Sequence, residues 1–298
     1  MKAMSKSKVS RKSVRKCCIC GKPAFSPKSN HCFACFVMIR RMEHENLPPE
    51  CIKEICEHVR RYGHVCFYTK IRLDRTDPKS PFYFVFDHMV PGEDKVVLTF
   101  ALLNEMKSDM IPKEFWYYIL QLDRYFRTGQ KIRKIKLSRW YRLAPLLEAK
   151  QGAMMLLPSE SLKALAKKCC LCGKPVYAPR AMYCPGCHQF VHSMDNRGIN
   201  NDAAKKILKY VHRHGFVCEY TETPLNMTDY KDPFYYEFDH TVPGASKVAL
   251  TFSLLNEMKS EMTLKEFKYY VGQFANFLRT GAKIKKRKLS HWFMLAQK

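Results

Sequence analysis

Hydrophobic residues recur at helical spacing at corresponding places in the two halves of the chain. Ile52, Ile55 and Val59 would lie on one face of a helix; prolines precede this stretch and a glycine follows it. Proline is accepted in the first turn of a helix and glycine commonly follows the last, so the pattern predicts a helix over residues 48–63. The same pattern, opened by Asn-Asp instead of prolines, predicts a helix over residues 201–215.

A longer apolar stripe marks the end of each half. Its members are three or four residues apart and each stripe is followed by a glycine, which predicts a helix with one buried face in each half. The stripes are Phe115, Ile119, Leu122 and Phe126, and Phe267, Val271, Phe274 and Leu278. We interpret both stripes as core and not as cofactor sites.

Between these helices, β-favouring runs predict short strands over residues 65–68 and 82–86. A helix that carries Leu102, Asn104 and Lys107 is expected to follow. Strands and helices of this kind in one chain predict an α+β fold.

These elements belong to an internal repeat with a constant offset of 152 residues. Between 81–109 and 233–261, 21 of the 29 positions are identical. Polar residues that are present in both copies are therefore the first candidates for function. The repeat divides the chain into a basic tail (1–16), a first repeat (17–143), a partly helical, packed connector (144–168) and a second repeat (169–298).

The charge of the chain points to an anionic partner. There are 52 Lys and Arg against 27 Asp and Glu, a formal net charge of +25. A field of this sign attracts polyanions, of which nucleic acid is the commonest in a cell, although a merely solvated surface and an acidic membrane face are alternatives. The basic stretch that ends each repeat supplies the expected contacts with nucleic acid: Lys131, Arg133, Lys134, Lys283, Lys285 and Lys286.

Cysteine spacing predicts two zinc sites. The chain has 14 cysteines, and eight of them form Cys-x-x-Cys pairs, with eleven residues between the two pairs of each repeat. Two such pairs suit a tetrahedral zinc ion, one per repeat, in a closed structural site. The expected ligands are Cys17, Cys20, Cys32 and Cys35, and Cys169, Cys172, Cys184 and Cys187. Cys66 and Cys218 also correspond, and we interpret them as small core residues in a strand.

Of the eleven histidines, only His88 and His240 correspond under the repeat offset. Each follows an aspartate, Asp87 or Asp239, and precedes a Pro-Gly turn. A lone histidine after a strand is more often structural than catalytic, but the duplication and the adjacent aspartate favour chemistry. A neutral imidazole can take a proton from water near neutral pH, and a carboxylate offers hard oxygen ligands to Mg²⁺.

The complete motif resembles the HNH, or ββα-metal, nuclease family. It reads Asp-His-x-Val-Pro, then Lys-Val-x-Leu-Thr, then Asn-x-x-Lys-Ser-Asp, over residues 64–109 and 216–261, with Glu261 in place of the last Asp in the second copy. It is most similar to the HNH domain of RNA-guided CRISPR effector nucleases. The resemblance implies two tandem modules, each a zinc knuckle followed by a ββα-metal motif. It implies that Asn104 and Asn256 complete a catalytic Mg²⁺ or Mn²⁺ site with the aspartates. Lys107 and Lys259, about one helical turn further on, are candidate phosphate contacts.

The sequence therefore predicts a metal-dependent HNH-type endonuclease that hydrolyses phosphodiester bonds in DNA, with RNA as an alternative substrate and one site in each repeat. The other interpretations are a non-catalytic zinc-containing nucleic-acid-binding protein and a scaffold for an acidic protein partner. No apolar run approaches the roughly 20 residues of a membrane span, and no secretory signal is visible. We expect an intracellular, cytoplasmic protein (nucleoid-associated, or nuclear in a eukaryote) that works as a monomer with a pseudo-dimeric arrangement.

Overall fold

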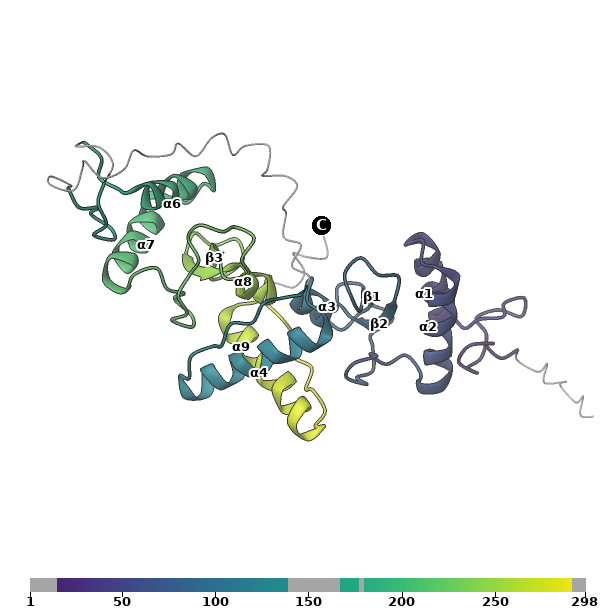
Figure 1. The fold of residues 1–298 in the computed structure, drawn as a ribbon. Helices are drawn as coiled ribbons and strands as arrows, with labels where there is room; N and C mark the ends of the chain where they lie inside the picture. The colour runs from purple at the N-terminus through teal and green to yellow at the C-terminus, as the bar shows by residue number, and fades with distance from the viewer. Residues whose placement is uncertain (1–14, 139–166, 177–179, 291–298) are drawn as a thin grey trace, which may run out of the picture. The chain divides into compact units, whose positions relative to one another are not determined.

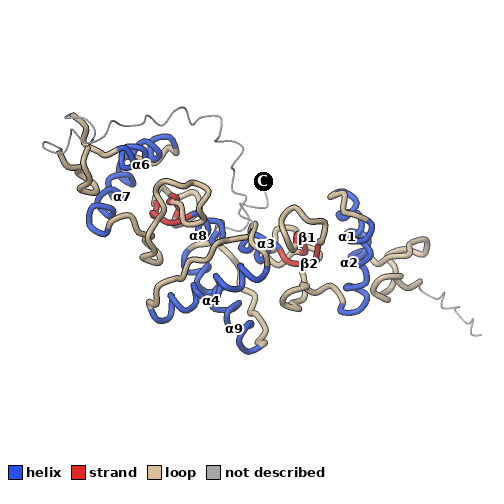
Figure 2. Tube along the Cα trace, viewed as in Figure 1, coloured by secondary structure: helices blue, strands red, loops and turns tan. Residues whose placement is uncertain are grey.

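The structure is a computed structural model, and it describes residues 15–138, 167–176 and 180–290 (Figure 1). Most of the described chain is helix and loop, and its named strands are confined to two short hairpins (Figure 2). The fold is therefore α+β, as predicted. No helix among the described residues is long and apolar enough to cross a membrane. The predictions for the basic tail and the connector fall almost wholly outside the described residues.

The chain forms two compact units, and their boundary does not follow the repeats. One unit contains Met1–Pro78 and Phe82–Phe100, and the other contains Lys79–Pro81 and Ala101–Lys298. The last two helices of the first repeat thus belong to the same unit as the whole second repeat. The reason lies in their apolar faces, which pack against the equivalent helices of the second repeat.

The first unit contains two helices and one hairpin. Helix α1 spans Phe33–His44 and α2 spans Pro49–Tyr62, and strands β1 (Phe84–His88) and β2 (Val96–Phe100) pair antiparallel. Helix α2 packs against β2. Its start at a proline and its end before a glycine confirm the helix predicted over residues 48–63.

The second unit repeats this order and adds four helices. Its elements are α3 (Ala101–Lys107), α4 (Pro112–Thr128), α6 (Pro185–Asn196), α7 (Asn201–His214), β3 (Tyr236–His240), β4 (Val248–Phe252), α8 (Ser253–Lys259) and α9 (Leu264–Thr280). The strands pair antiparallel, with Asp239 opposite Ala249. Helix α8 packs against both strands of this hairpin, and α7 packs against β4.

The aromatic stripes join α4 and α9, which cross in Figure 1. Phe115 on α4 lies 6.1 Å from Phe274 on α9, between ring centroids, and Phe126 lies 6.3 Å from Phe267. Because Phe267 is the counterpart of Phe115, the packing is nearly reciprocal between the repeats. This confirms the prediction that both stripes are core.

Three details differ from the sequence predictions. The knuckle regions continue into helices α1 and α6, which the cysteine pattern did not predict. Residues 65–68 do not form a strand. Val65 makes only an isolated bridge with Arg72, and the chain then turns, with the Cys66 amide donating to the Ile71 carbonyl and Lys70 at a φ of 56°. The strand predicted over 82–86 lies two residues later, in β1.

Candidate functional site

The two four-cysteine sets each come together as one cluster. In both sets the four sulfur atoms lie within 4.8 Å of one another. The sulfurs of Cys20 and Cys32 are 3.5 Å apart, as are those of Cys172 and Cys184. A tetrahedral zinc ion with bonds of about 2.3 Å separates its sulfurs by about 3.8 Å, so both clusters fit the ion. Four thiol ligands leave no open position, which is typical of a structural site.

The backbone favours the thiolate form of the first ligand in each cluster. Burial raises the pKa of Cys17, but the amides of Cys20, Cys32 and Ile19 that face its sulfur outweigh this effect and lower the pKa to about 6. The pKa of Cys169 is lowered to about 6 by the same balance. Because the thiolate is the form that binds metal, these turns suit the ligand role.

The two corresponding histidines are exposed at the ends of β1 and β3. His88 Nδ1 lies 2.9 Å from the Glu93 carbonyl oxygen, and His240 Nδ1 lies 2.8 Å from the Ala245 carbonyl oxygen. A carbonyl oxygen only accepts, so Nδ1 carries the proton in both rings. The neutral ring then has its lone pair on Nε2, which is the tautomer that a general base requires.

The loop after each strand sets this orientation. The Met89 amide donates to the Lys95 carbonyl across the loop, and the Thr241 amide does the same to the Lys247 carbonyl. Glycines 92 and 244 in these loops have φ values of 75° and 76°, a conformation that other residues adopt with strain. The Pro-Gly turn identified in the sequence therefore brings a carbonyl back to the ring.

The aspartates before the histidines are buried, with 4% of each residue exposed. The hydroxyl of Tyr68 donates to Asp87 Oδ2 at 2.6 Å, and that of Tyr220 donates to Asp239 Oδ2 at 2.5 Å. Burial raises the pKa of both tyrosines, and the adjacent carboxylate raises it further, so the phenols stay protonated. The sequence analysis missed both tyrosines, although their place in the repeated Cys-x-Tyr-Thr segment could have indicated them.

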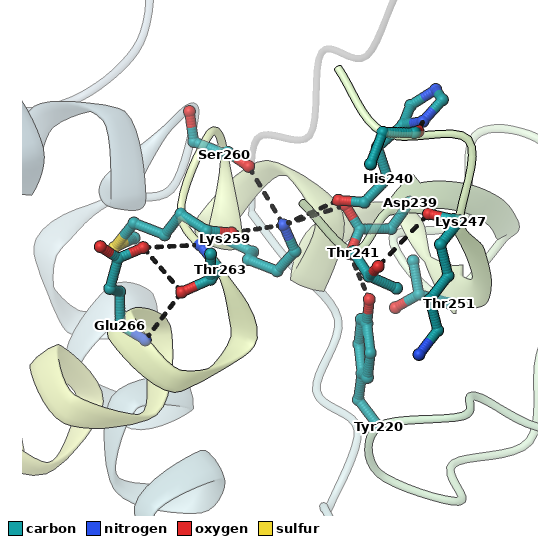
Figure 3. Close-up of polar contacts among 12 residues, drawn as sticks. Tyr220, Asp239, His240, Thr241, Lys247, Thr251, Lys259, Ser260, Thr263 and Glu266 are labelled. Carbon is teal, nitrogen blue, oxygen red and sulfur yellow. Dashed lines mark hydrogen bonds and ion pairs between the residues drawn. The ribbon is translucent and has the colours of Figure 1, made fainter. Parts of the chain in front are cut away.

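In the second repeat the other carboxylate oxygen is also engaged. The Lys259 ammonium lies 3.1 Å from Asp239 Oδ1 and has no exposed surface. Figure 3 shows this ammonium between Asp239 and the turn that follows α8, whereas the ring of His240 points away from it. Burial raises the pKa of Asp239, and the Lys259 charge and the Tyr220 hydrogen bond partly offset that effect.

Carbonyl groups complete the surroundings of Lys259. The ammonium donates to the Met262 carbonyl at 2.6 Å and to the Ser260 carbonyl at 3.4 Å. Ser260 adopts a φ of 47°, which turns the chain sharply between α8 and α9. In the first repeat Lys107 makes the same bond to the Met110 carbonyl, at 2.8 Å. Both lysines therefore join secondary-structure elements inside the protein.

This burial corrects the expectation that Lys107 and Lys259 contact nucleic acid. Their residues are 1% and 0% exposed, so neither ammonium can reach an external phosphate in this arrangement. The six residues expected in the basic stretches are all exposed. Lys134 differs from the others because it donates to the Pro224 carbonyl at 2.9 Å and lies 4.3 Å from the centroid of the Phe234 ring.

The residues around Asp239 do not fit a divalent metal ion as they are arranged. One carboxylate oxygen pairs with a buried ammonium and the other accepts a phenol hydrogen bond. A cation beside Oδ1 already supplies the charge that Mg²⁺ or Mn²⁺ would supply, and it repels a second cation. Asn256 lies on α8 with its side chain half-buried, and among the described residues that side chain has no hydrogen bond. In the first repeat Asp87 and Asn104 belong to different compact units.

Comparisons of the chain with protein families, with curated proteins and with solved structures find no match. The chain combines two zinc-compatible cysteine clusters, two anchored histidines and a large positive charge.

Proposed function

We propose that this chain is a zinc-stabilised endonuclease of the HNH type that hydrolyses phosphodiester bonds in DNA, with one site in each repeat. The observation that carries the proposal is the anchored histidine, which has the same tautomer at the same strand end in both repeats. A structural histidine has no need of an exposed ring. An exposed ring whose Nδ1 is anchored can accept a proton from water at Nε2.

In the proposed reaction each histidine acts as a general base. Nε2 of His88 or His240 removes a proton from a water molecule as the oxygen of that water forms a bond to phosphorus. The bond from phosphorus to the sugar oxygen on the opposite side breaks, and the departing oxygen takes a proton from solvent. The Tyr-Asp hydrogen bond beside each histidine fixes the strand end from which the ring projects. No step is assigned to Mg²⁺ or Mn²⁺, because the carboxylate of Asp239 is already paired.

The charge and the helix pairing support DNA as the substrate. The exposed lysines and arginines at the ends of both repeats suit a phosphate backbone. The nearly reciprocal packing of α4 and α9 is what a pseudo-dimer requires, and duplex DNA has two strands related by two-fold axes. Two sites in one chain could then each act on one strand.

A plasmid-nicking assay tests the proposal. The zinc-loaded chain should nick supercoiled DNA, and the double variant His88→Ala/His240→Ala should nick roughly 10²- to 10⁴-fold more slowly with unchanged DNA affinity. His44→Ala, which removes an exposed histidine at the end of α1, is the matched control and should leave the rate unchanged. Parallel reactions with Mg²⁺, with Mn²⁺ and with chelator measure the metal requirement.

The buried pairing of Asp239 with Lys259 favours a second candidate, a zinc-containing nucleic-acid-binding protein without catalysis. On that interpretation the contacts of Asp239 with Lys259 and Tyr220 only stabilise the fold, and the histidines have no catalytic role. The same assay separates the two: tight, salt-sensitive DNA binding without nicking under any metal condition would support the second candidate and would contradict the first.

A further inference from the structure

A basic pocket lies beside the cysteine cluster of the first repeat. It has a volume of about 260 Å³ and is open to solvent at one side of the first compact unit. None of its lining residues is acidic. The lining residues that carry charge or can carry it are Lys22, Arg60, His64, Arg72 and Arg75, with Cys20 of the zinc cluster among the others.

Three separate segments build this pocket. Arg60 comes from the last turn of α2. Gly63, with a φ of 78°, ends this helix, and the next residue, His64, also lines the pocket. Arg72 lies opposite Val65 in an isolated β-bridge, and Arg75 follows a few residues later. The third segment is the knuckle turn that carries Lys22. Cationic side chains from three parts of the chain therefore line the same pocket.

One lining residue of the pocket, His64, contacts the cysteine cluster. Nε2 of His64 lies 3.7 Å from the sulfur of Cys35, and His64 is 7% exposed. Burial lowers the pKa of His64 to about 4, with smaller contributions from the charges of Arg75 and Lys22. The positive charge of the pocket comes from the lysine and the arginines.

Three of these cations have no acidic partner among the residues that the structure describes. Among the described residues, Lys22, Arg60 and Arg75 form no ion pair. The neighbouring Arg61 differs, since it stacks on the Tyr62 ring with 5.2 Å between its guanidinium carbon and the ring centroid. Cations that converge without acidic partners repel one another, so an anion between them would lower the energy of the site.

Comparison with the second repeat indicates that the arginines of this pocket do more than stabilise the zinc cluster. A zinc ion with four thiolates carries a net charge of −2, and nearby cations could simply offset it. The second repeat has an equivalent cysteine cluster, yet under the repeat offset Arg60 becomes His212, Arg72 becomes Pro224 and Arg75 becomes Met227. If the zinc centre needed these arginines, both repeats would be expected to keep them.

We infer that this pocket binds a phosphate group. Arginine presents a planar fork of donors that matches the oxygens of phosphate, and a lysine adds a further point charge. Pockets for drug-sized ligands have volumes of roughly 300–1,000 Å³, so the smaller hollow suits a phosphate group with part of its attached sugar. The phosphate can belong to a nucleic-acid backbone or to a small phosphate compound.

The test follows the arginine side chains directly. Inorganic phosphate is titrated into the zinc-loaded full chain at constant ionic strength, and the Nε–H resonances of Arg60 and Arg75 are recorded by NMR. Both resonances should shift and saturate. The variant Arg60→Ala/Arg75→Ala should bind phosphate at least about tenfold more weakly, because it removes two charged hydrogen-bond donors from the pocket. The variant Lys205→Ala/Lys209→Ala removes the same charge from exposed positions on α7 and should bind as the parent does.

A second arm identifies the source of the phosphate. A duplex oligonucleotide without terminal phosphates that shifts the same resonances, and is displaced by inorganic phosphate, places a backbone phosphate in the pocket. Saturation with inorganic phosphate alone indicates a small phosphate compound. The inference is overturned if the arginine shifts stay linear in phosphate, or if the α7 variant loses as much affinity as the pocket variant.

Two controls keep the outcome interpretable. Zinc content shows whether the double variant is folded, and the single variant Arg75→Met, which introduces the residue of the second repeat, provides a milder change that should still weaken binding. The pocket shares no residue with the proposed catalytic set. His88→Ala/His240→Ala should therefore bind phosphate normally, so a failure of catalysis and a failure of this inference are distinguishable.

Discussion

The two repeats agree around the strand-end histidine and differ around the cysteine cluster. In both, a buried aspartate accepts a tyrosine hydrogen bond and an exposed histidine is anchored through Nδ1. Near the clusters, the first repeat has a basic pocket whose arginines are replaced in the second. The repeats thus share a framework and a candidate reaction, whereas the arginines of the inferred phosphate pocket are found in the first repeat and are replaced in the second.

Removal of one zinc ligand should have the largest effect, and it should be equal in the two repeats. The intact chain should hold about two zinc ions, and Cys17→Ser or Cys169→Ser should each leave about one. Structural zinc contributes roughly 10–16 kcal/mol to the folding of small zinc modules, so the affected knuckle should unfold. Metal analysis and proteolysis would detect both changes.

The exposed neighbours of these ligands provide matched controls. Cys18→Ser and Cys170→Ser change a thiol one position away, outside the clusters, and should retain about two zinc ions. Full metal content in Cys17→Ser, or a loss in Cys18→Ser, would show that the ligand assignment is wrong.

Loss of the buried lysine should have the next largest effect. Lys259→Met leaves Asp239 with an uncompensated buried charge, which typically costs about 3–5 kcal/mol of stability. Lys209→Met, on the exposed surface of α7, should change stability little. Urea denaturation would measure both variants.

A second substitution isolates the ion pair. Adding Asp239→Asn to Lys259→Met removes the buried charge while keeping an oxygen that can accept from Tyr220, so much of the stability should return. Equal stability of the single and double variants would contradict the assignment of Lys259 as the partner of Asp239.

The smallest expected effect concerns the start of α9, where the repeats also differ. Glu266 is partly buried, which raises its pKa, but hydrogen bonds from Ser290 and Thr263 outweigh this effect and lower the pKa to about 2. A carboxyl group with a lowered pKa stabilises the fold above its unfolded pKa of about 4.5, and this contribution is lost as the pH falls towards 2. Because the group is largely solvated, we expect roughly 1 kcal/mol.

Glu266→Gln should lower the free energy of unfolding at neutral pH by that amount. Between about pH 5 and pH 2, the free energy of unfolding of this variant should fall less steeply than that of the parent chain. Glu54→Gln, at an exposed position on α2, should leave the pH profile as it is in the parent chain. A profile of Glu266→Gln that still matches the parent would mean that the carboxylate does not stabilise the start of the helix.

The sequence predicted the elements whose apolar spacing and end signals agree. Helices α2 and α7 begin and end close to the predicted residues, because prolines or polar capping residues and a glycine flank their apolar faces. Helices α4 and α9 carry the predicted apolar stripes and end before the predicted glycines. Helix α1 was missed because its cysteine was interpreted only as a ligand, although Cys35, Met38 and Met42 form its buried face at helical spacing.

The sequence indicated which candidate residues recur in the two repeats, but not which atoms their side chains contact. The repeat offset identified the histidines and aspartates that recur in both halves, and the four-cysteine clusters formed where the spacing predicted them. Burial of Lys107 and Lys259 could not be foreseen, since lysine is almost never fully buried unless it is paired. Its partners in the second repeat include Asp239, which is twenty residues away in the chain, and a carbonyl exposed by the turn at Ser260.

Strand-specific cleavage tests the central claim, that both repeats carry the same reaction, most directly. A duplex labelled at both 5′ ends would be incubated with the zinc-loaded parent chain, with His88→Ala and with His240→Ala. The parent chain should cut both strands, and each variant should lose cleavage of one strand, a different strand in each case. Cleavage abolished by one variant and unaffected by the other would contradict the claim that both repeats carry the reaction.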